Sequence, residues 1–392
     1  MPPADGRVRL VIVVSNLEFG GAQRQIVELA NELDPARFEP HVVSLSPYTP
    51  LGKDLKRPDR LHVITKRFKF DLSVVPRLAW LLRRLRADIV HGYLFDAEIA
   101  ARLAGRLART PLVVGSERNT DYTLKRRQRL TYRLTRGSVD LMIANSSAGA
   151  EFNQRTLGMD PGIYRVVHNG VDTSRFRPLD ARPTRRELGV ADDEPLIGMF
   201  ASFKRQKNHP LLLEAAPRVL ERFPGARLLF VGDELYLGMH GSDEYKRRIE
   251  AQIDALGLRP RCLFLGNRPE VERLYPCCDL TVLPSLFEGT PNVALESLAC
   301  GVPVVATDVS DNARVIPDGQ AGFITPLGDA AALAERVIRV LSDRTLRDML
   351  GRQARGWVER EFSTRRLAQK TAEVYERALA ERADRRPAME SV

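Results

Sequence analysis

The chain has 392 residues, of which 44% are hydrophobic, so it is long enough for two domains that each bury a core. No run approaches the roughly 18 apolar residues of a membrane-spanning helix, and the apolar stretch near the start is too short for a signal peptide. The four cysteines form no CxxC pair, which argues against a disulfide framework or a zinc site and fits a reducing cytoplasm.

The net charge of +10 is concentrated in the first half of the chain. Residues 1–178 contain 29 Lys and Arg but only 18 Asp and Glu, and basic clusters occur at residues 66–69, 83–86 and 125–129. Such clusters are typical of solvated helix faces, but they also fit attraction to an anionic membrane surface or an acidic acceptor. Nucleic acid is disfavoured, because no RNP, zinc-finger or aromatic-interleaved basic motif is present.

Both halves alternate apolar strands with amphipathic helices, the pattern of parallel α/β sheets. In the first half we expect strands at residues 9–15, 41–46, 88–93, 112–116 and 141–145, and helices such as 22–33 and 75–85. In the second half we expect strands at residues 196–201, 227–232, 262–265, 280–284 and 302–306. This pattern predicts two Rossmann-like domains with a cleft between them, in which ligands bind at the carboxyl ends of the strands.

The domain boundary is expected within residues 177–194, which are rich in proline and charge. We therefore predict a first domain over residues 1–180 and a second over residues 181–372. Residues 357–379 have the pattern of one or two amphipathic helices, and the polar end from about residue 385 is expected to fray.

The most informative segment is residues 283–308, LPSLFEGTPNVALESLACGVPVVATD. An apolar strand ends in a turn that contains Glu288, Pro291 and Asn292 open a helix, and Glu296 lies about one turn inside that helix. The amides at a helix N-terminus can hold a phosphate, and a neighbouring carboxylate can bind sugar or ribose hydroxyls. The segment therefore predicts a nucleotide-sugar site.

Glu288 and Glu296 fit the E-x7-E pattern of the retaining glycosyltransferases of family 4, which have the GT-B fold. The flanking EGTPNVALESLACGVPVVAT resembles that family's signature nearly end to end, and YRVVHNGVDTSRFRP resembles its domain-junction segment. The resemblance implies two Rossmann-like parallel-sheet domains that face a central cleft. It also implies a C-terminal helix, about residues 373–392, that returns to the first domain.

The resemblance places most of the donor site in the second domain. Lys207, in the stretch from Gly198, fits the lysine that contacts the donor diphosphate, and Glu288 is expected to bind hydroxyls of the donor sugar; we take both as catalytic. Glu296 is expected to bind the ribose, and the backbone near Arg268 the nucleobase. Ser202 stands where the family has arginine, so Arg205 or Lys204 is considered as a substitute charge. The expected donor-binding residues are Gly20, Gly21, Ser202, Arg205, Lys207, Arg268, Glu288, Gly289, Thr290, Pro291, Asn292, Val293 and Glu296.

The first domain is expected to provide the acceptor side and a loop over the donor phosphates. Gly20 and Gly21 resemble the family's GGAE loop, with Gln23 in place of the glutamate. His91 fits the first histidine of an H-x-H pattern, whose second position, usually placed near the transferred sugar, is Tyr93 here. The candidate acceptor-side residues are His91, Tyr93, Asp96, Glu98 and Arg118. VGDELYLG, from Val231, resembles the family's VGDG loop without its second glycine.

The resemblance implies a retaining transfer of a hexosyl or N-acetylhexosaminyl group from a nucleotide diphosphate sugar, UDP before GDP, to an acceptor hydroxyl. No cofactor or metal is expected. The basic first domain favours a lipid-linked or envelope-polysaccharide acceptor, and hence a cytoplasmic protein at the inner face of the cell membrane. The alternatives are a non-catalytic nucleotide-sugar-binding protein, as Ser202 and Tyr93 would allow, a nucleotide-sugar 2-epimerase, and a nucleic-acid-binding protein.

Overall fold

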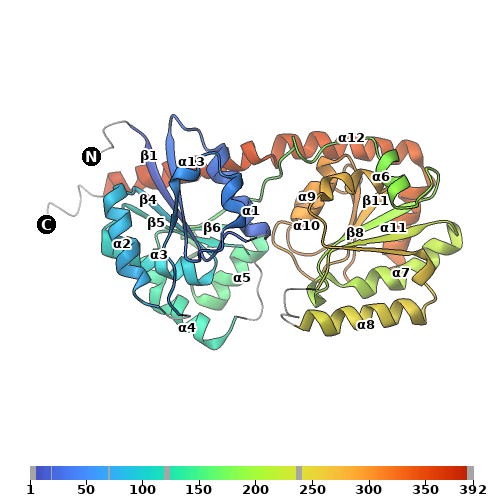
Figure 1. Ribbon diagram of the computed structural model, residues 1–392, viewed down its shortest axis with the longest axis horizontal. Coiled ribbons are helices and arrows are strands. Elements are labelled where there is room, and N and C mark those ends of the chain that lie inside the picture. The colour runs from blue at the N-terminus through green and yellow to red at the C-terminus, as the bar shows by residue number, and fades with distance from the viewer. Residues whose placement is uncertain (1–5, 19, 69–70, 119–123, 235–240, 386–392) are drawn as a thin grey trace. The chain divides into compact units, whose positions relative to one another are not determined.

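The computed structural model describes residues 6–18, 20–68, 71–118, 124–234 and 241–385. The chain divides into two compact units, each with its own parallel sheet (Figure 1). The first unit comprises Met1–Gly170 and Thr364–Val392, and the second comprises Val171–Ser363. The first junction therefore lies before the residue 180 expected from the sequence, and the chain returns to the first unit at Thr364 rather than at about residue 373.

The first unit contains a seven-stranded parallel sheet of order β3-β2-β1-β4-β5-β6-β7. Its strands are β1 (Val8–Val14), β2 (Phe38–Ser44), β3 (Leu61–Val63), β4 (Ile89–Tyr93), β5 (Leu112–Glu117), β6 (Leu141–Ala144) and β7 (Tyr164–Val166). Its helices are α1 (Gly21–Glu32), α2 (Val74–Leu85), α3 (Phe95–Ala108), α4 (Arg126–Thr135), α5 (Ser147–Leu157) and α13 (Thr364–Arg385). The strand order reverses between β1 and β4, which makes their carboxyl ends the topological switch point.

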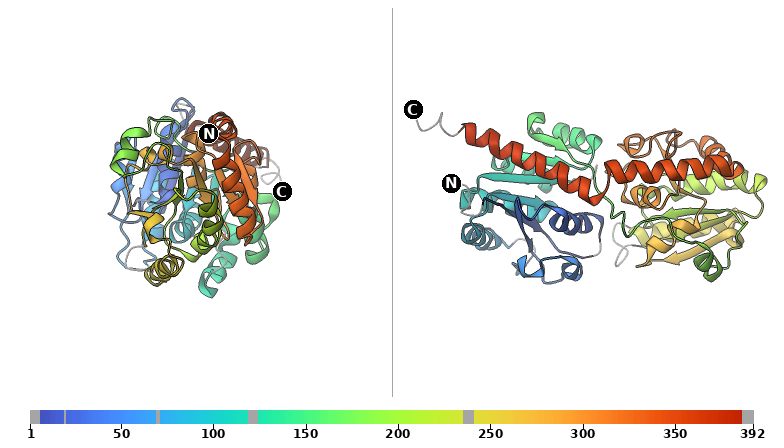
Figure 2. Two further views of the ribbon diagram at one scale, coloured as in Figure 1. Left: turned by 90° about the vertical axis from the view of Figure 1, so that its right-hand side faces the viewer. Right: turned by 90° about the horizontal axis from the view of Figure 1, so that it is seen from above.

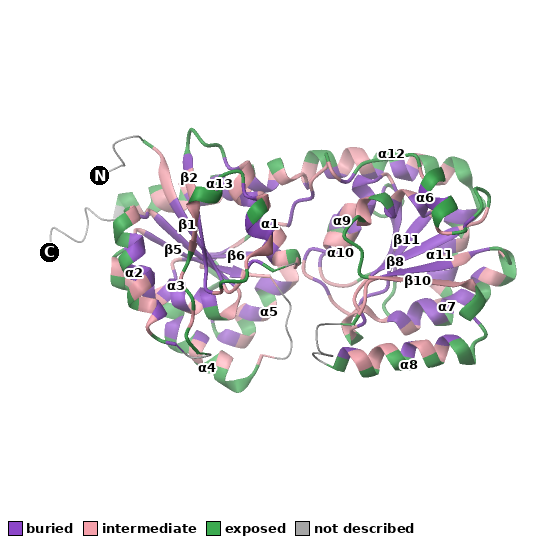
Figure 3. Ribbon diagram, viewed as in Figure 1, coloured by how far each residue is buried: buried purple, intermediate pink, exposed green. Residues whose placement is uncertain are grey.

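Helices cover both faces of this sheet, so β1 is apolar on both sides. Leu10 and Ile12 belong to the core beneath α1 and α13, whereas Val11 and Val13 belong to the core beneath α2 and α3. This alternation follows from the two-residue period of a strand. Figure 3 shows the strands as buried and the outer helix faces as exposed. Figure 2 shows α13 as one long helix along the first unit, where Tyr375 lies in the core.

The second unit contains a six-stranded parallel sheet of order β10-β9-β8-β11-β12-β13. Its strands are β8 (Leu196–Phe200), β9 (Arg227–Val231), β10 (Cys262–Gly266), β11 (Leu280–Leu283), β12 (Val304–Thr307) and β13 (Gly322–Thr325). Its helices are α6 (Arg182–Glu187), α7 (His209–Arg222), α8 (Ser242–Ala255), α9 (Asn292–Ala299), α10 (Asn312–Val315), α11 (Ala330–Ser342) and α12 (Arg344–Glu361). Here the order reverses between β8 and β11, whose carboxyl ends are the second switch point.

These two sheets confirm the predicted pair of Rossmann-like parallel-sheet domains. All ten strands expected from the sequence are present, although their ends differ by up to three residues. The sequence interpretation did not identify β3, β7 and β13, which are the short outer strands of the two sheets. β3 and β7 have only three residues each, which is too short for the two-residue alternation of apolar and polar side chains to stand out.

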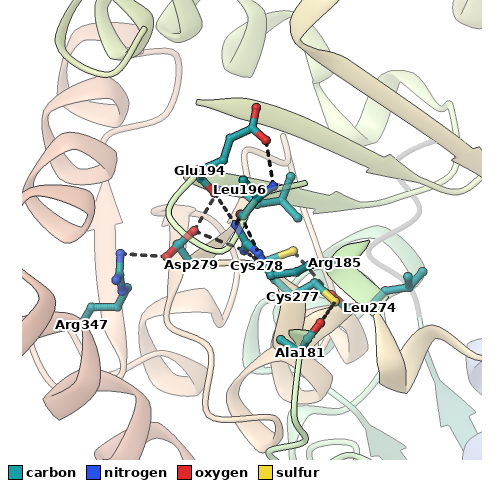
Figure 4. Close-up of polar contacts among 10 residues, drawn as sticks. Ala181, Arg185, Glu194, Leu196, Leu274, Cys277, Cys278, Asp279 and Arg347 are labelled. Atoms are coloured by element: carbon teal, nitrogen blue, oxygen red, sulfur yellow. Dashed lines mark hydrogen bonds and ion pairs between the residues drawn. The ribbon is translucent and has the colours of Figure 1, made fainter. Parts of the chain in front are cut away.

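A buried arginine holds β8 and β11 together at their amino ends (Figure 4). The Arg185 guanidinium donates hydrogen bonds to the carbonyl oxygens of Ala191 and Cys277, at 2.7 and 2.5 Å. Asp279, just before β11, accepts a hydrogen bond from the Leu196 amide at 2.8 Å and forms an ion pair with Arg347 at 2.9 Å. This network lies at the amino ends of β8 and β11, whereas the switch point lies at their carboxyl ends. It fixes the spacing between these two strands.

Candidate active site

The loops after β8 and β11 meet at the switch point of the second unit. The Leu286 amide donates to the Gln206 carbonyl oxygen at 2.8 Å, and the Gln206 side chain donates to the Phe287 carbonyl oxygen at 2.9 Å. The first loop contains the short 3₁₀ helix Arg205–Lys207, and the second leads into α9. The hydrogen bonds therefore hold Lys207 and Glu288, 81 residues apart in sequence, on adjoining loops.

Lys207 and Glu288 form an ion pair in which Lys207 Nζ lies 2.6 Å from Glu288 Oε1. The two side chains are only 16% and 7% exposed. The Ser285 hydroxyl donates to the same carboxylate oxygen at 2.7 Å, and the Glu288 amide donates to Ser310 Oγ at 3.0 Å. Ser310 follows β12 and has a left-handed backbone with φ of 52°. Loops after three neighbouring strands thus fix the orientation of Glu288.

A second lysine lies close to this pair. Burial, and then the charge of Lys207, lowers the pKa of Lys204, whereas the charge of Glu288 opposes this shift. Arg205, by contrast, is exposed, and Ser202 is half-buried after the end of β8. Of the two residues considered as substitutes for the arginine that Ser202 replaces, Lys204 is the less exposed, and its charge interacts with both catalytic candidates.

Helix α9 begins beside Glu288, as the sequence predicted, with Pro291 at the N-cap position. The pyrrolidine ring of proline offers no side-chain acceptor, and no side-chain cap hydrogen bond is found there among the described residues. The amides of a first helical turn have no partner within their own helix and carry partial positive charge. Thr290 and Pro291 are buried and Gly289, Asn292 and Val293 are half-buried, so these residues bring the helix end to the site.

Glu296, one turn into α9, accepts a hydrogen bond from the Tyr275 hydroxyl at 2.6 Å. Tyr275 is buried, and its ring stacks on Phe200 at the end of β8, with ring centroids 3.8 Å apart. Burial, and then the charge of Glu296, raises the pKa of Tyr275 well above its ordinary value, so the phenol remains a donor. The sequence interpretation did not identify Tyr275, Ser285 or Ser310; Tyr275 lies 21 residues from its partner, with no repeat or spacing to connect them.

Glycine is required at Gly232, where the chain leaves β9. Its φ is 132°, and a Cβ atom there would lie 2.3 Å from the Ala201 carbonyl oxygen. The chain after β9 therefore packs directly against the chain that leads to Ser202. The VGDELYLG loop continues into residues 235–240, which lie outside the described residues. Arg268 is exposed after β10 and borders a small pocket of about 250 Å³.

The first unit has its own cluster of expected site residues. Gly20 is extended, with φ of −160°, and α1 begins at Gly21. The largely buried Gln23 folds back over this turn and donates to Asn16 Oδ1 at 2.9 Å. Gln25, which the sequence interpretation did not identify, exchanges two hydrogen bonds with the backbone of Gly170, at 2.7 and 2.8 Å.

His91 is fully buried, and both of its ring nitrogens have partners. Nδ1 lies 2.6 Å from the Tyr375 hydroxyl of α13, and Nε2 lies 2.8 Å from the Ser116 hydroxyl of β5. Burial, and then the charge of Arg118, lowers the pKa of His91 well below its ordinary value. His91 therefore stays neutral and connects β4, β5 and α13, which argues against a role at the surface.

Tyr93 and Arg118 contact each other at the carboxyl ends of β4 and β5. Tyr93 is 1% exposed, and its hydroxyl accepts a hydrogen bond from Arg118 at 3.0 Å. Arg118 also donates to Asn169 at 2.9 Å. The four residues after Arg118 in GSERNTDY lie outside the described residues.

Two carboxylates near the start of α3 differ sharply. Asp96 is 45% exposed and pairs with Lys66 at 2.5 Å. Glu98 is 1% exposed and pairs with the fully buried Arg102 at 2.5 Å, while the Tyr132 hydroxyl donates to its other oxygen at 3.2 Å. The expectation that Glu98 faces an acceptor is therefore wrong, because its carboxylate is buried in an ion pair with Arg102.

Family models match both units of the chain. The model of glycosyl transferases group 1 matches residues 180–357, and that of glycosyltransferase family 4 matches residues 19–175. The chain belongs to glycosyltransferase family 4. It is a glycosyltransferase that uses nucleotide sugars, and its two parallel sheets are those of the GT-B fold.

Family 4 relatives match at moderate identity. The chain is 26% identical over 315 residues to the UDP-Gal:alpha-D-GlcNAc-diphosphoundecaprenol alpha-1,3-galactosyltransferase of Escherichia coli, which covers 78% of this chain and 79% of that one. It is 32% identical over 252 residues to the D-inositol 3-phosphate glycosyltransferase of Streptomyces bingchenggensis, covering 62% of this chain but only 54% of that protein.

Solved structures of similar proteins share the fold over nearly the whole chain. Anabaena HepE in complex with UDP has a TM-score of 0.81 at 21% identity, covering 94% of this chain and all of that one. Sucrose-phosphate synthase from Thermosynechococcus elongatus has a TM-score of 0.73 at 20% identity, covering 96% and 100%. At these identities, the likeness shows the fold alone.

Among its described residues, this family 4 protein has neither a membrane-spanning helix nor a metal-binding cluster. No helix in this part of the chain is both long and apolar enough to cross a bilayer. In the same described part of the chain, no group of three or more His, Cys, Asp or Glu side chains lies close enough together to hold a metal ion. Independence from metal remains a prediction.

Proposed function

We propose that the protein is a retaining glycosyltransferase that transfers a hexosyl or N-acetylhexosaminyl group from a UDP-sugar, with a GDP-sugar as the second choice. The observation that supports this most is the Lys207–Glu288 pair at the switch point of the second unit, beside the start of α9. It brings a cation, a carboxylate and a helix N-terminus together, which are the three groups that a sugar diphosphate requires.

The donor diphosphate would lie against Lys207 and the backbone amides at the start of α9, those of Thr290, Asn292 and Val293. Negative charge builds on the diphosphate as the bond to the sugar breaks, and a buried ammonium stabilises that charge more strongly than it stabilises the bound donor. The helix N-terminus adds fixed partial charge of the same sign. Glu288 would accept hydrogen bonds from hydroxyls of the sugar, because a carboxylate has about four acceptor positions and the contacts with Ser285 and Lys207 fix its orientation at the site.

Glu296 would bind the ribose hydroxyls of the nucleotide. Its hydrogen bond from Tyr275 fixes the carboxylate on the first turn of α9. The backbone near Arg268 would contact the nucleobase, as the sequence resemblance implies.

Lys204 would supply the second positive charge that Ser202 does not. Its interactions with Lys207 and Glu288 favour it over the exposed Arg205. Two neighbouring ammonium groups repel each other until a dianion binds, so the bound diphosphate would be stabilised by both.

For retention, we place bond breaking and bond making on the same face of the sugar, with the leaving phosphate accepting the proton of the acceptor hydroxyl. No histidine base is assigned, because both nitrogens of His91 have partners inside the first unit. No metal is assigned either, since Lys207, Lys204 and the start of α9 provide the positive charge.

The acceptor would be a lipid-linked or envelope-polysaccharide glycan, met at the inner face of the cell membrane. Support comes from the basic first half of the chain and from relatives. The Escherichia coli relative is described as acting with UDP-Gal and a diphosphoundecaprenol-linked sugar, and Anabaena HepE was solved with UDP and with UDP-glucose. Asp96 is the exposed acceptor-side candidate of the first unit.

A non-catalytic nucleotide-sugar-binding protein is the second candidate. The serine at position 202 and the buried, fully hydrogen-bonded His91 favour it, because both depart from the catalytic pattern of the family. Such a protein would bind the donor without turning it over.

The test is turnover of UDP- and GDP-sugars, followed by released nucleotide, with NMR of the product to read the anomeric configuration. Wild type should release nucleotide and keep the configuration, and Lys207→Ala and Glu288→Ala should each lower kcat about 100-fold or more. Arg205→Ala serves as the exposed, charge-matched control. An inverted product, or full activity in both variants, would refute the proposal; donor binding without turnover would support the second candidate.

A further inference from the structure

An apolar groove lies in the first unit between α2, α3 and α4. Its volume is about 700 Å³. Its apolar lining includes Leu72, Val74, Val75, Phe95, Ile99 and Leu103. Lys66, Lys125, Arg126 and Arg127 also border it. A groove of this composition fits a hydrocarbon chain with an anionic group at its end.

Large apolar side chains lie on the exposed surface beside this groove. Leu72 lines the groove and is 78% exposed, and Leu130 and Leu134 of α4 are 58% and 76% exposed. Leu130 and Leu134 are four residues apart, so they lie on the same face of the helix. Leu72 thus lies in the groove itself, and Leu130 and Leu134 lie on the helix whose residues Gln128 and Thr131 line it.

The same helix carries a dense row of positive charge. Arg126, Arg127, Arg129 and Arg133 are all exposed. Within the part of the chain that the structure describes, none of these four forms an ion pair with a carboxylate. The two carboxylates at the groove are already engaged, Asp71 by Arg77 at 3.1 Å and Asp96 by Lys66 at 2.5 Å. The surface is therefore basic as well as apolar.

We propose that α4 and the mouth of this groove dock on an anionic lipid bilayer. Leu130 and Leu134 would enter the boundary between headgroups and acyl chains, and the arginines would lie at the level of the lipid phosphates. The groove would take the hydrocarbon chain of one anionic lipid, with Lys125, Arg126 and Arg127 against its phosphate. Interleaved leucine and arginine favour this partner over nucleic acid, which requires no apolar insertion. The inference deepens the proposed function and rests on it only in naming the acceptor as lipid-linked.

The test is flotation of the full chain with phosphatidylcholine vesicles that contain either no phosphatidylglycerol or about one third of it. Wild type should float only with the anionic vesicles, and less at high salt. Arg126→Gln/Arg127→Gln should lower partitioning about 25-fold, at about fivefold per arginine. Leu130→Ser/Leu134→Ser should weaken binding at both salt concentrations, and Leu72→Asp should weaken it by placing a negative charge at the groove.

Matched controls come from the second unit. Leu256, which is 43% exposed, provides Leu256→Ser and Leu256→Asp, and the exposed Arg247 and Arg248 provide Arg247→Gln/Arg248→Gln. These variants should float like wild type, and every variant should keep the wild-type melting temperature, because all the positions are exposed.

Equal flotation with neutral vesicles, or anionic flotation unchanged by the α4 and Leu72 variants, would overturn the proposal. Stronger binding to a DNA duplex than to anionic vesicles would also overturn it and would assign the surface to nucleic acid. Nucleotide-induced thermal shifts measured on the same samples separate this outcome from the proposed function, since donor binding involves residues of the second unit that these variants leave intact.

Discussion

Breaking the Lys207–Glu288 ion pair should destabilise the second unit, because each charge compensates the desolvation of the other inside the protein. The atoms are 2.6 Å apart, and the side chains are 16% and 7% exposed. Removing one partner of a fully buried pair costs about 3–5 kcal/mol, since a desolvated charge is left behind. The remaining exposure lets water reach the surviving charge, so we expect about 2–3 kcal/mol for either Lys207→Met or Glu288→Gln.

The double variant should be more stable than the sum of the single variants predicts. With both charges removed, neither partner is left to face the loss of the other, and the coupling free energy should be at least about 1.5 kcal/mol. For a unit of this size, each 1 kcal/mol changes the melting temperature by about 2–4 °C, so the single variants should melt about 4–12 °C lower.

Urea unfolding of the wild type, the two single variants and the double variant measures the coupling. Lys246 and Asp233 provide the control cycle, because they pair at 2.5 Å in the same unit but are 27% and 34% exposed. Their coupling should stay below about 1 kcal/mol. If the Lys207 and Glu288 variants are additive within about 0.5 kcal/mol, the reasoning from burial is refuted.

Three further predictions concern single side chains. Glu98→Gln should lower the free energy of unfolding by about 3–5 kcal/mol in urea, because it leaves the buried Arg102 unpaired. Because the pKa of His91 is lowered in the folded protein, the unfolded chain binds a proton below about pH 6.5 that the folded chain does not. The free energy of unfolding should therefore fall below that pH by up to about 1.4 kcal/mol per pH unit. In His91→Gln this fall should be shallower. Lys204→Gln should weaken nucleotide binding about tenfold by calorimetry, and Arg205→Gln only slightly, because the charge of Lys204 interacts with Lys207 and Glu288 whereas Arg205 is exposed.

Each of these has a contradicting result. Unfolding of Glu98→Gln within about 1 kcal/mol of wild type would show that water reaches the carboxylate. A fall between pH 7 and 5 that is as steep in His91→Gln as in wild type would assign it to other groups. An affinity loss larger for Arg205→Gln than for Lys204→Gln would make Arg205 the substitute cation.

The sequence predicted the parts of this molecule that depend on local pattern. Strand positions, the start of α9 at Asn292 and the two site loops follow from apolar runs and from turn residues close together in the chain. The outer strands β3 and β7 did not, because three residues are too few for a period to appear.

Partners far apart in sequence could not be predicted. The sequence makes His91 a candidate acceptor-side residue, but its partner Tyr375 lies 284 residues away in the chain. Glu98 and Arg102 have the four-residue spacing of a helical ion pair, but the sequence does not show that Tyr132 encloses them. Whether Lys204 or Arg205 faces Lys207 depends on the turn of the 3₁₀ helix Arg205–Lys207, which the residue types alone do not fix.

The central claim is that the second unit binds a nucleotide diphosphate sugar through α9 and Lys207. The most direct measurement is a thermal-shift panel of UDP, GDP, ADP and their common sugar conjugates on wild type, Glu296→Ala and the exposed control Arg205→Ala. A ligand at 100 times its Kd stabilises the folded state by about 2.7 kcal/mol, enough to move the melting temperature by several degrees. The account predicts that a uridine nucleotide stabilises wild type and Arg205→Ala but not Glu296→Ala; equal shifts in all three proteins, or no shift with any nucleotide, would contradict it.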